Sequence, residues 1–242
     1  MEPRFVDCHS HVVPSGDDGA RTLEDGLELC DLAADCGTAI LFATPHVWPH
    51  LLLSEEREHE VRQAFERLAR QARLELRLGF ELTPTPPLLR EDPARYALEG
   101  TDVVLIEVPF LGPYSDLVEL AEHVERAGLT PLVAHPERTE PIRTEPELAF
   151  ELAERWPLQL NATSLIGYHG REIEELAWRF LDVASVVASD GHRMARPARL
   201  DEAYELVKAR VGEEAALPLF DGSALGLRAL RPPPSRAGAR GA

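Results

Sequence analysis

The sequence predicts an α/β protein whose parallel β-sheet closes into a barrel. Two observations predict the parallel sheet. Short apolar runs alternate with helical patterns along the chain, and these runs are continuously apolar, as in strands covered on both faces. A third observation favours a closed barrel over an open sheet. Each run ends in residues of chemical interest, and in a barrel the loops at the carboxyl ends of the strands converge on one site.

We expect seven strands, and helical patterns with apolar residues every three or four positions fill the intervals between them. The strands cover residues 5–6, 39–43, 74–80, 103–106, 131–134, 158–160 and 185–188. Helix-capping residues predict the first residues of four helices, at Thr22, Ser54, Ser115 and Thr144. Further helical patterns lie within residues 87–98, 173–180 and 200–211.

The chain shows no linker and no internal repeat. We therefore expect residues 1–230 to form a single domain. Residues 231–242 are rich in Pro, Arg and Gly and poor in apolar side chains, which predicts a disordered tail.

The composition excludes several classes of function. The chain has 242 residues, 44% of them hydrophobic, and a formal net charge of −17. Such an acidic protein lacks the basic face that binds nucleic acid, so no nucleic-acid partner is expected. Lys208 is the single lysine, which excludes a Walker-type phosphate loop. The sequence has no run long enough to span a bilayer and no signal-peptide pattern, so we expect a cytoplasmic protein without membrane insertion.

The cysteines Cys8, Cys30 and Cys36 predict neither a disulfide framework nor a zinc knuckle, because they are odd in number and form no Cys-x-x-Cys pair. None is followed by the arginine of a Cys-x5-Arg phosphatase loop. We therefore expect no cysteine nucleophile.

Histidines and carboxylates stand at the ends of the predicted strands. They are His9, His11, His46, Glu81, Glu107, His135, Asp190 and His192. A single histidine at a strand end is usually an ordinary loop residue. Glu107 differs, because it directly follows a buried run, where a carboxylate needs a strong partner. Since parallel strands bring their carboxyl ends together, we expect the eight side chains to form one metal centre.

Imidazole and carboxylate ligands without thiolates suit Zn²⁺, Mn²⁺ or Fe²⁺ better than a structural zinc site. Eight ligands are too many for one such ion, so two or three ions bridged by carboxylates are expected. Cys8 is expected in the core. Among the remaining histidines, His59 and His123 are expected to face solvent, while His50 and His169 lie in loops on the expected active face.

Several motifs occur in a fixed order that resembles the PHP (polymerase and histidinol phosphatase) superfamily over roughly residues 5–210. They read Asp-x-His-x-His at 7–11, Ala-Thr-Pro-His at 43–46, a Glu after Gly-x at 81, Leu-Ile-Glu-x-Pro at 105–109, Ala-His-Pro-Glu-Arg at 134–138 and Ser-Asp-Gly-His at 189–192. Within the superfamily, the chain resembles the bacterial metal-dependent tyrosine phosphatases of capsular and exopolysaccharide synthesis. The segments that carry this likeness are 17–20, 161–165 and 196–197.

The resemblance implies a distorted (β/α)7 barrel with a trinuclear metal centre, commonly manganese, at the carboxyl ends of the strands. The eight residues above would be its ligands. Arg138 and Arg196 would hold the substrate phosphate, and Asp7 and Asp18 would orient ligands or water. The implied reaction is hydrolysis of protein phosphotyrosine by metal-activated hydroxide, which regulates polysaccharide synthesis or export. A bacterial tyrosine kinase of that process is an implied partner.

Three departures from the family pattern, at Val47, Thr139 and Ala195, fall in substrate loops and leave the substrate open. Residues 47–49 and 110–114 are expected to supply an apolar rim for a phenyl ring. One alternative is another phosphomonoesterase of the same superfamily, such as a histidinol phosphatase. The other is a non-catalytic, metal-binding regulatory module.

Overall fold

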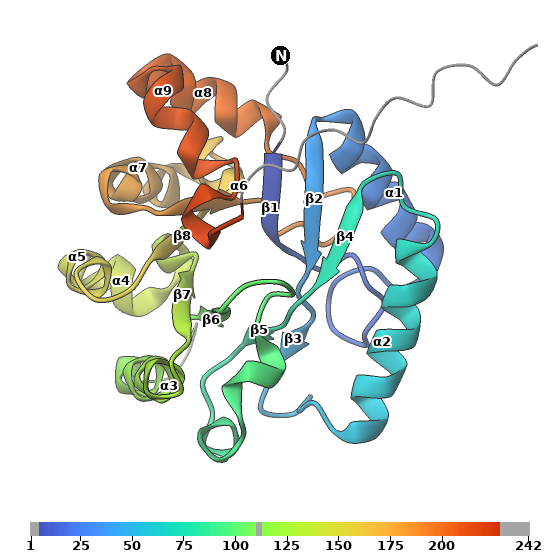
Figure 1. The fold of residues 1–242 in the computed structure, drawn as a ribbon. Helices are drawn as coiled ribbons and strands as arrows, with labels where there is room; N and C mark the ends of the chain where they lie inside the picture. The colour runs from blue at the N-terminus through green and yellow to red at the C-terminus, as the bar shows by residue number, and fades with distance from the viewer. Residues whose placement is uncertain (1–4, 110–112, 228–242) are drawn as a thin grey trace, which may run out of the picture.

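Every strand pair in the computed structural model is parallel (Figure 1), within the described residues 5–109 and 113–227. The strands are β1 (Phe5–Ser10), β2 (Thr38–Ala43), β3 (His46–Val47), β4 (Glu75–Leu78), β5 (Glu81–Leu82), β6 (Val103–Glu107), β7 (Thr130–Ala134), β8 (Leu158–Asn161) and β9 (Val186–Ala188). They form two sheets, ordered β1-β2-β4 and β3-β5-β6-β7-β8-β9.

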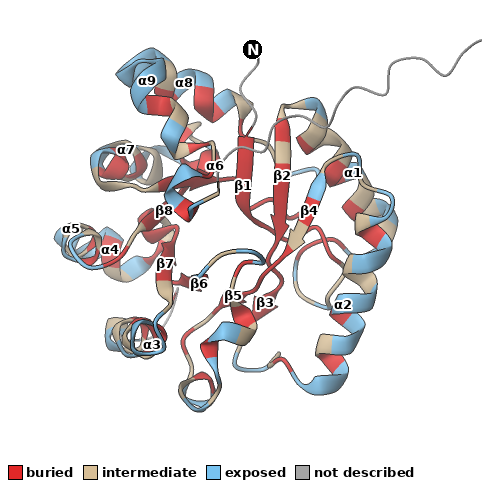
Figure 2. Ribbon diagram, in the orientation of Figure 1, coloured by how far each residue is buried: buried red, intermediate tan, exposed pale blue. Residues whose placement is uncertain are grey.

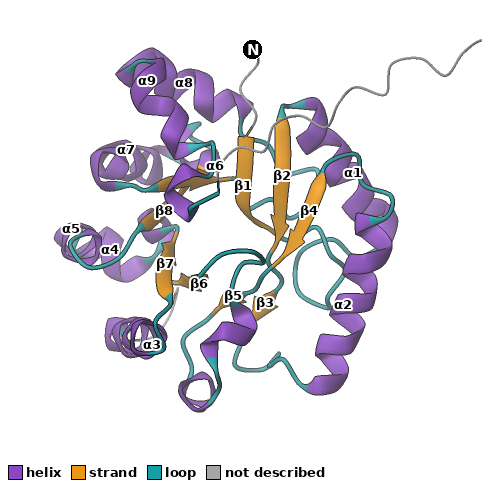
Figure 3. Ribbon diagram, viewed as in Figure 1, coloured by secondary structure: helices purple, strands orange, loops and turns teal. Residues whose placement is uncertain are grey.

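Helices fill most of the connections and lie around the outside of the strands (Figures 1 and 3). The α-helices are α1 (Leu23–Asp35), α2 (Glu55–Ala69), α3 (Tyr114–Arg126), α4 (Glu140–Thr144), α5 (Glu147–Ala153), α6 (Ala162–Leu165), α7 (Arg171–Phe180), α8 (Asp201–Val211) and α9 (Glu213–Ala216). The 3₁₀ turns are η1 (Pro86–Arg90), η2 (Pro93–Tyr96), η3 (Pro136–Arg138), η4 (Leu181–Val183), η5 (Leu217–Leu219) and η6 (Ser223–Leu225). The alternation with parallel pairing confirms the predicted α/β class.

The expected strand 74–80 is longer than the strand in the structure. Only β4 at residues 75–78 falls within it, residues 79–80 form a break, and the separate strand β5 follows. At Gly79 a Cβ would lie 2.5 Å from Leu98 Cδ2, so any larger residue here would have to displace this buried side chain. A similar break at residues 44–45 separates β2 from β3. In the short pair that results, His46 lies directly opposite Glu81.

Backbone hydrogen bonds link the two sheets at both of their edges. Gly79 N donates to Ala43 O at 2.9 Å and Glu81 N donates to Pro45 O at 3.3 Å, so the pairing of β2 with β4 continues into that of β3 with β5. On the other side, His11 N donates to Gly191 O at 2.7 Å, where the loop after β9 passes the end of β1.

The strands carry an apolar core on each face (Figure 2). The larger cluster lies between the strands and the helices and includes Leu41, Val104 and Leu160. The smaller cluster draws side chains from both sheets, which therefore share one apolar interior. Its members are Val6, Cys8, Ile40, Phe42, Leu98, Val103, Leu105, Leu132, Ala134, Val186, Ala188 and Leu225. The expectation that Cys8 is a core residue is thus confirmed.

The helix starts follow the predicted caps in two of four cases. Thr22 forms a capping box at α1, and the Ser54 side chain accepts a backbone hydrogen bond at α2, as expected. The prediction for Ser115 is wrong, because α3 already begins at Tyr114, directly after a proline that fixes its own φ, and Ser115 lies inside the helix. The prediction for Thr144 is also wrong, because this residue ends α4, and α5 starts after a second proline.

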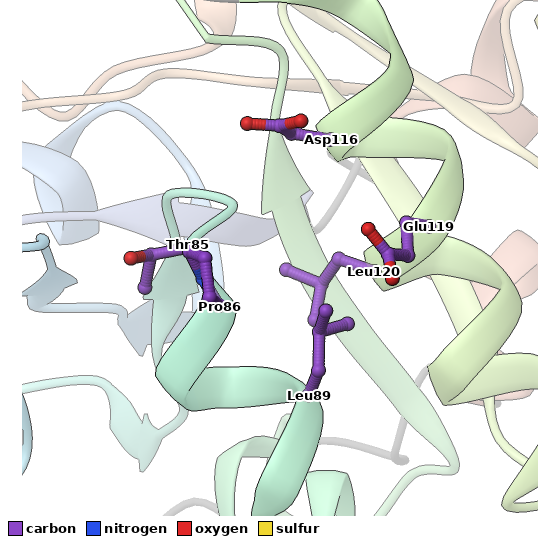
Figure 4. A pocket seen from close by; sticks show the side chains of 6 residues that line it. All are labelled: Thr85, Pro86, Leu89, Asp116, Glu119 and Leu120. Carbon is purple, nitrogen blue, oxygen red and sulfur yellow. The ribbon is translucent and has the colours of Figure 1, made fainter.

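Two expectations fall outside the described residues: the part of the apolar rim at 110–112 and the tail at 231–242. Within the described residues, no helix is long and apolar enough to cross a membrane. A crevice of about 30 Å³ lies between η1 and α3 (Figure 4) and has room for only a few waters. None of the predicted site residues lines it, so it is not the candidate active site.

Candidate metal centre

The eight predicted ligands meet at the carboxyl ends of the strands, and all are buried. Their ligand atoms form four overlapping groups of three, and within each group all atoms lie within 4.8 Å of one another. The groups are His11–His46–His192, His9–Glu81–His135, His9–His11–Asp190 and His46–Glu81–Glu107. The structure therefore brings together the complete set that the sequence indicated.

Glu81 lies at the centre of this arrangement. Its Oε2 is 2.9 Å from His46 Nδ1, 3.1 Å from His9 Nε2 and 3.2 Å from His11 Nε2. Its Oε1 lies 2.9 Å from His135 Nε2. Although burial disfavours its charge, the imidazoles of His9 and His46 hold the pKa of the carboxyl well below its usual range.

Asp190 is the second carboxylate that faces several imidazoles. Its Oδ1 lies 3.3 Å from His192 Nδ1, 3.4 Å from His9 Nε2 and 3.5 Å from His11 Nε2. Asp190 has a φ of 51° and His135 a φ of 33°. Non-glycine residues in this left-handed region are strained, and such strain is concentrated at functional sites.

Glu107 completes the carboxylates from the end of β6. Its Oε1 lies 4.0 Å from His46 Nδ1 and accepts a short hydrogen bond from the Thr83 hydroxyl. Burial, together with the neighbouring charge of Glu81, raises the pKa of Glu107 to about 7. A nearby cation would favour the charged form and reverse this shift.

The donor atoms fit divalent metal ions. Glu81 Oε2 is buried and makes no hydrogen bond, although three imidazole nitrogens surround it. Donors that converge in this way are the arrangement of ligands around ions bridged by a carboxylate. Burial, followed by the proximity of His11, lowers the pKa of His192 to about 4, so this imidazole is neutral, as ligation requires.

Arg138 and Arg196 border the group on the side of Asp190. Arg138 Nη1 donates a short hydrogen bond to Asp190 Oδ2, and Arg196 Nη2 lies 3.8 Å from Asp190 Oδ1. Their side chains are 13% and 19% exposed, which leaves both guanidinium groups within reach of a ligand that enters from solvent.

The two predicted orienting carboxylates occupy different positions. Asp7 is fully buried, and its Oδ1 accepts hydrogen bonds from Ser189 N at 3.0 Å and His9 N at 3.3 Å. It therefore ties β1 to the loop after β9. Asp18 is 56% exposed, with Oδ1 3.2 Å from His192 Nε2 and 3.6 Å from His46 Nε2, so it borders the solvent side of the cluster.

Two residues that contact the candidate ligands were not singled out for these roles. Asp17 Oδ2 lies 3.3 Å from His11 Nδ1 and accepts a hydrogen bond from His46 N, and Gln159 Oε1 lies 2.9 Å from His9 Nδ1. A carboxylate or amide on the far nitrogen of a metal-binding histidine orients the ring. The signal for Gln159 was present in the sequence, as a polar residue within a buried apolar run.

The other four histidines divide differently from the prediction. His59 is exposed, as expected, but His123 is half-buried, with Nε2 2.9 Å from the carbonyl oxygen of Glu91, because the segment between η1 and η2 packs against α3. His50 is exposed and stacks on Trp48, with ring centroids 5.3 Å apart. Burial and the nearby charges of the two arginines lower the pKa of His169 to about 4.

Parallel strands whose carboxyl ends carry buried imidazoles and carboxylates are the architecture of metal-dependent α/β hydrolases. The chain belongs to a particular family of this class, the CpsB/CapC family of capsular polysaccharide synthesis, whose profile matches residues 5–225.

Named relatives cover most of the chain. Tyrosine-protein phosphatase YwqE of Bacillus subtilis is 28% identical over 236 residues, which is 93% of this chain and 92% of YwqE. CapC of Staphylococcus aureus is 30% identical over 215 residues, which is 83% of this chain and 82% of CapC.

The fold is also similar to solved structures. One comes from a study of YwqE from Bacillus subtilis and CpsB from Streptococcus pneumoniae, described as metal-dependent tyrosine phosphatases. It matches with a TM-score of 0.79 at 27% identity and covers 89% of this chain and 91% of its own. The lactonase Lmo2620 of Listeria monocytogenes shares the fold alone, with a TM-score of 0.55 at 11% identity, over 93% of this chain and 94% of its own.

Proposed function

We propose that this protein is a metal-dependent phosphatase of protein phosphotyrosine that acts in capsular or exopolysaccharide synthesis. The observation that carries the proposal is the combination of four overlapping groups of histidines and carboxylates with Arg138 and Arg196 at their edge. Relatives named tyrosine-protein phosphatases, from Bacillus subtilis and Streptococcus agalactiae, support the same reaction.

We assign the eight buried residues as ligands of two to three divalent ions, with manganese as the first candidate and zinc or iron as alternatives. Glu81 and Asp190 suit the role of bridging ligands, because each faces at least three imidazole nitrogens. Bound ions would lower the pKa of a coordinated water and neutralise phosphate oxygens.

The arginines are assigned to the phosphate. A guanidinium group offers two parallel N–H donors that match two phosphate oxygens, and Asp190 holds both arginines beside the metal ligands. Asp18 is assigned to orienting water, because it is exposed and adjoins His192 and His46. A tyrosine leaving group, with a pKa of about 10, departs more easily than an alkoxide and needs less help from a general acid.

For the fold we propose a distorted (β/α)7 barrel within a single domain of residues 1–230. Interrupted strands count once in this arrangement. Strands β2 and β3 together form one strand of the barrel, and β4 and β5 together form another. Two features support the proposal: the hydrogen bonds that link the sheets at both edges, and the apolar interior that both sheets share.

The proposed substrate is a phosphotyrosine protein, with a bacterial tyrosine kinase of polysaccharide synthesis as the proposed partner and the cytoplasm as the proposed location. The activity and family of the relatives support the substrate class. The kinase partner and the location stay predictions from the sequence.

The test compares three substrates on protein loaded with Mn²⁺: a phosphotyrosine peptide, the matching phosphoserine peptide and histidinol phosphate. We expect the highest kcat/KM on phosphotyrosine, and loss of all turnover after chelation. A preference for histidinol phosphate would replace the proposal with a small-molecule phosphatase. If a generic aryl phosphate is also left intact under every metal tested, the protein is a metal-binding regulatory module.

A further inference from the structure

A chain of buried hydrogen bonds joins two of the assigned ligands, His9 and Asp190, through two amide side chains. His9 Nδ1 lies 2.9 Å from Gln159 Oε1. Gln159 Nε2 donates to Asn161 Oδ1 at 2.8 Å, and Asn161 Nδ2 donates to Asp190 Oδ2 at 2.8 Å. All four residues are at most 2% exposed, so water does not compete for these hydrogen bonds.

Asp190 determines which group donates and which accepts along this series of hydrogen bonds. A ligating carboxylate is ionised and can only accept hydrogen bonds, so Asn161 must present its NH₂ group to Asp190. The oxygen of Asn161 then faces Gln159, which must present its own NH₂ group in turn. The oxygen of Gln159 therefore faces His9, and the proton of the imidazole must be on Nδ1.

This order has a consequence for each ligand. With its proton on Nδ1, His9 presents a bare Nε2 to Glu81 Oε2 and Asp190 Oδ1, at 3.1 and 3.4 Å. Asp190 has its Oδ2 occupied by Asn161 and Arg138, which leaves Oδ1 toward the three imidazoles. The hydrogen bonds thus fix two ligand atoms of the His9–His11–Asp190 group, Nε2 of His9 and Oδ1 of Asp190, before an ion binds.

Strand β8 supplies both amides because alternate residues of a strand share one face. Gln159 and Asn161 point to the site, while Leu158 and Leu160 pack in the larger core on the other face. Burying two amides is costly unless their donors and acceptors are used, and these bonds use them.

We propose that Gln159 and Asn161 form a positioning relay that fixes the tautomer of His9 and the ligating oxygen of Asp190, and so sets the affinity of the His9–His11–Asp190 group for its metal ion. The inference rests on the proposed metal centre and is independent of which phosphorylated substrate the protein hydrolyses.

The first test measures metal stoichiometry and affinity for Mn²⁺ in Gln159→Met, Asn161→Leu and the double variant, with Leu160→Met as a control on the other face of β8. Each relay variant should weaken one ion by about 10- to 100-fold, the range for partners of metal ligands. The double variant should cost no more than the larger single change, because either change breaks the same relay. Leu160→Met should bind metal as the wild type does.

Asn161→Asp separates polarity from packing. It keeps the size and the acceptor for Gln159 but sets a carboxylate oxygen against Asp190, so it should lose more affinity than Asn161→Leu. If space filling were the role of the residue, Asn161→Asp would be the better tolerated change. Wild-type affinity in Gln159→Met and Asn161→Asp would overturn the relay.

A measurement on the wild-type protein covers the case in which the variants do not fold. With diamagnetic Zn²⁺ bound, ¹⁵N NMR of the ring should show His9 protonated on Nδ1. Protonation on Nε2 would overturn the proposal without any variant. If the wild-type protein binds no metal, the proposed metal centre itself is wrong. If the wild type and the relay variants bind metal equally well, the metal centre stands and only the relay is wrong.

Discussion

The candidate metal centre and the apolar interior are built from the same strands and differ in what they contribute. On β6, Leu105 packs in the interior, and two residues later Glu107 enters the ligand cluster. On β1 the change from Cys8 to His9 takes a single residue. Burial of apolar side chains stabilises the fold, whereas buried carboxylates cost free energy until a partner neutralises them. The interior therefore maintains the fold on which the strained, charged site depends.

The largest effect should follow from removal of a ligand. Glu107→Gln keeps the size of the side chain but removes the charge, so metal occupancy should fall, with a loss of about 10³-fold or more in kcat. The apo-protein should be as stable as the wild type or more so, because a buried carboxylate is gone. His9→Ala should likewise lose metal and activity together. Full activity after exhaustive chelation would show that the reaction needs no metal ion and would contradict the role proposed for these ligands.

The reverse pattern is expected two residues earlier on the same strand. Leu105→Ala removes buried methyl groups from the interior and should lower the free energy of unfolding by about 2–5 kcal/mol. Below the unfolding transition, metal content and kcat per folded molecule should stay close to the wild type. Chemical denaturation measures the free energy of unfolding, metal analysis measures the metal content, and steady-state kinetics measures kcat. Loss of metal in the folded state would show that the interior also tunes the site.

A smaller effect should separate phosphate binding from metal binding. Arg138→Lys keeps the charge but loses the two-donor fork, so kcat/KM should fall by about 30-fold, or about 2 kcal/mol, with metal content unchanged. Arg196→Lys should behave similarly. Arg143→Lys is the matched control, because Arg143 pairs with Glu172 on the surface. Wild-type kinetics in both site variants would make the two arginines structural partners of Asp190.

Trp48 tests whether an aromatic side chain at the rim of the site contacts the substrate. Its ring stacks on His46 with centroids 4.3 Å apart, so it lies directly against a proposed metal ligand. Trp48→Ala should lower kcat/KM for a phosphotyrosine peptide by about tenfold, the order of one lost aromatic contact, and affect a small alkyl phosphate less. Trp48→Phe should recover most of the difference. Equal losses on both substrates would remove Trp48 from the substrate pocket.

The smallest effect is expected at the start of α2. The Ser54 side chain caps this helix by accepting a hydrogen bond from Arg57 N, so Ser54→Ala should cost about 1 kcal/mol of stability without a change in activity. Ser115→Ala should stay within about 0.5 kcal/mol, because Ser115 is not a cap. Thermal unfolding of the two variants side by side gives the answer, and equal losses would contradict the assigned cap.

The pattern of residues along the chain is sufficient to predict the α/β class and the eight candidate metal ligands, but not the contacts of Asp17 and Gln159 with them. Continuous apolar runs between helical patterns predict parallel strands, because strands buried on both faces need no alternation. Parallel strands end on one side of the sheet, so residues such as His9, Glu107 and Asp190 could be grouped although they are far apart in the chain. Cys8 could be placed in the core for a similarly local reason, its place between two histidines.

The arrangement of these residues follows from contacts between strands that are distant in the sequence. The register between two distant segments is one example: β2 pairs Ala43 with Leu78 of β4, and the same offset continues past the breaks in both strands and places Glu81 opposite His46. The direction of the relay from Asp190 through Asn161 to His9 likewise depends on which donor meets which acceptor. These contacts form between strands that are far apart in the sequence, and the pattern of residue types along the chain does not specify them.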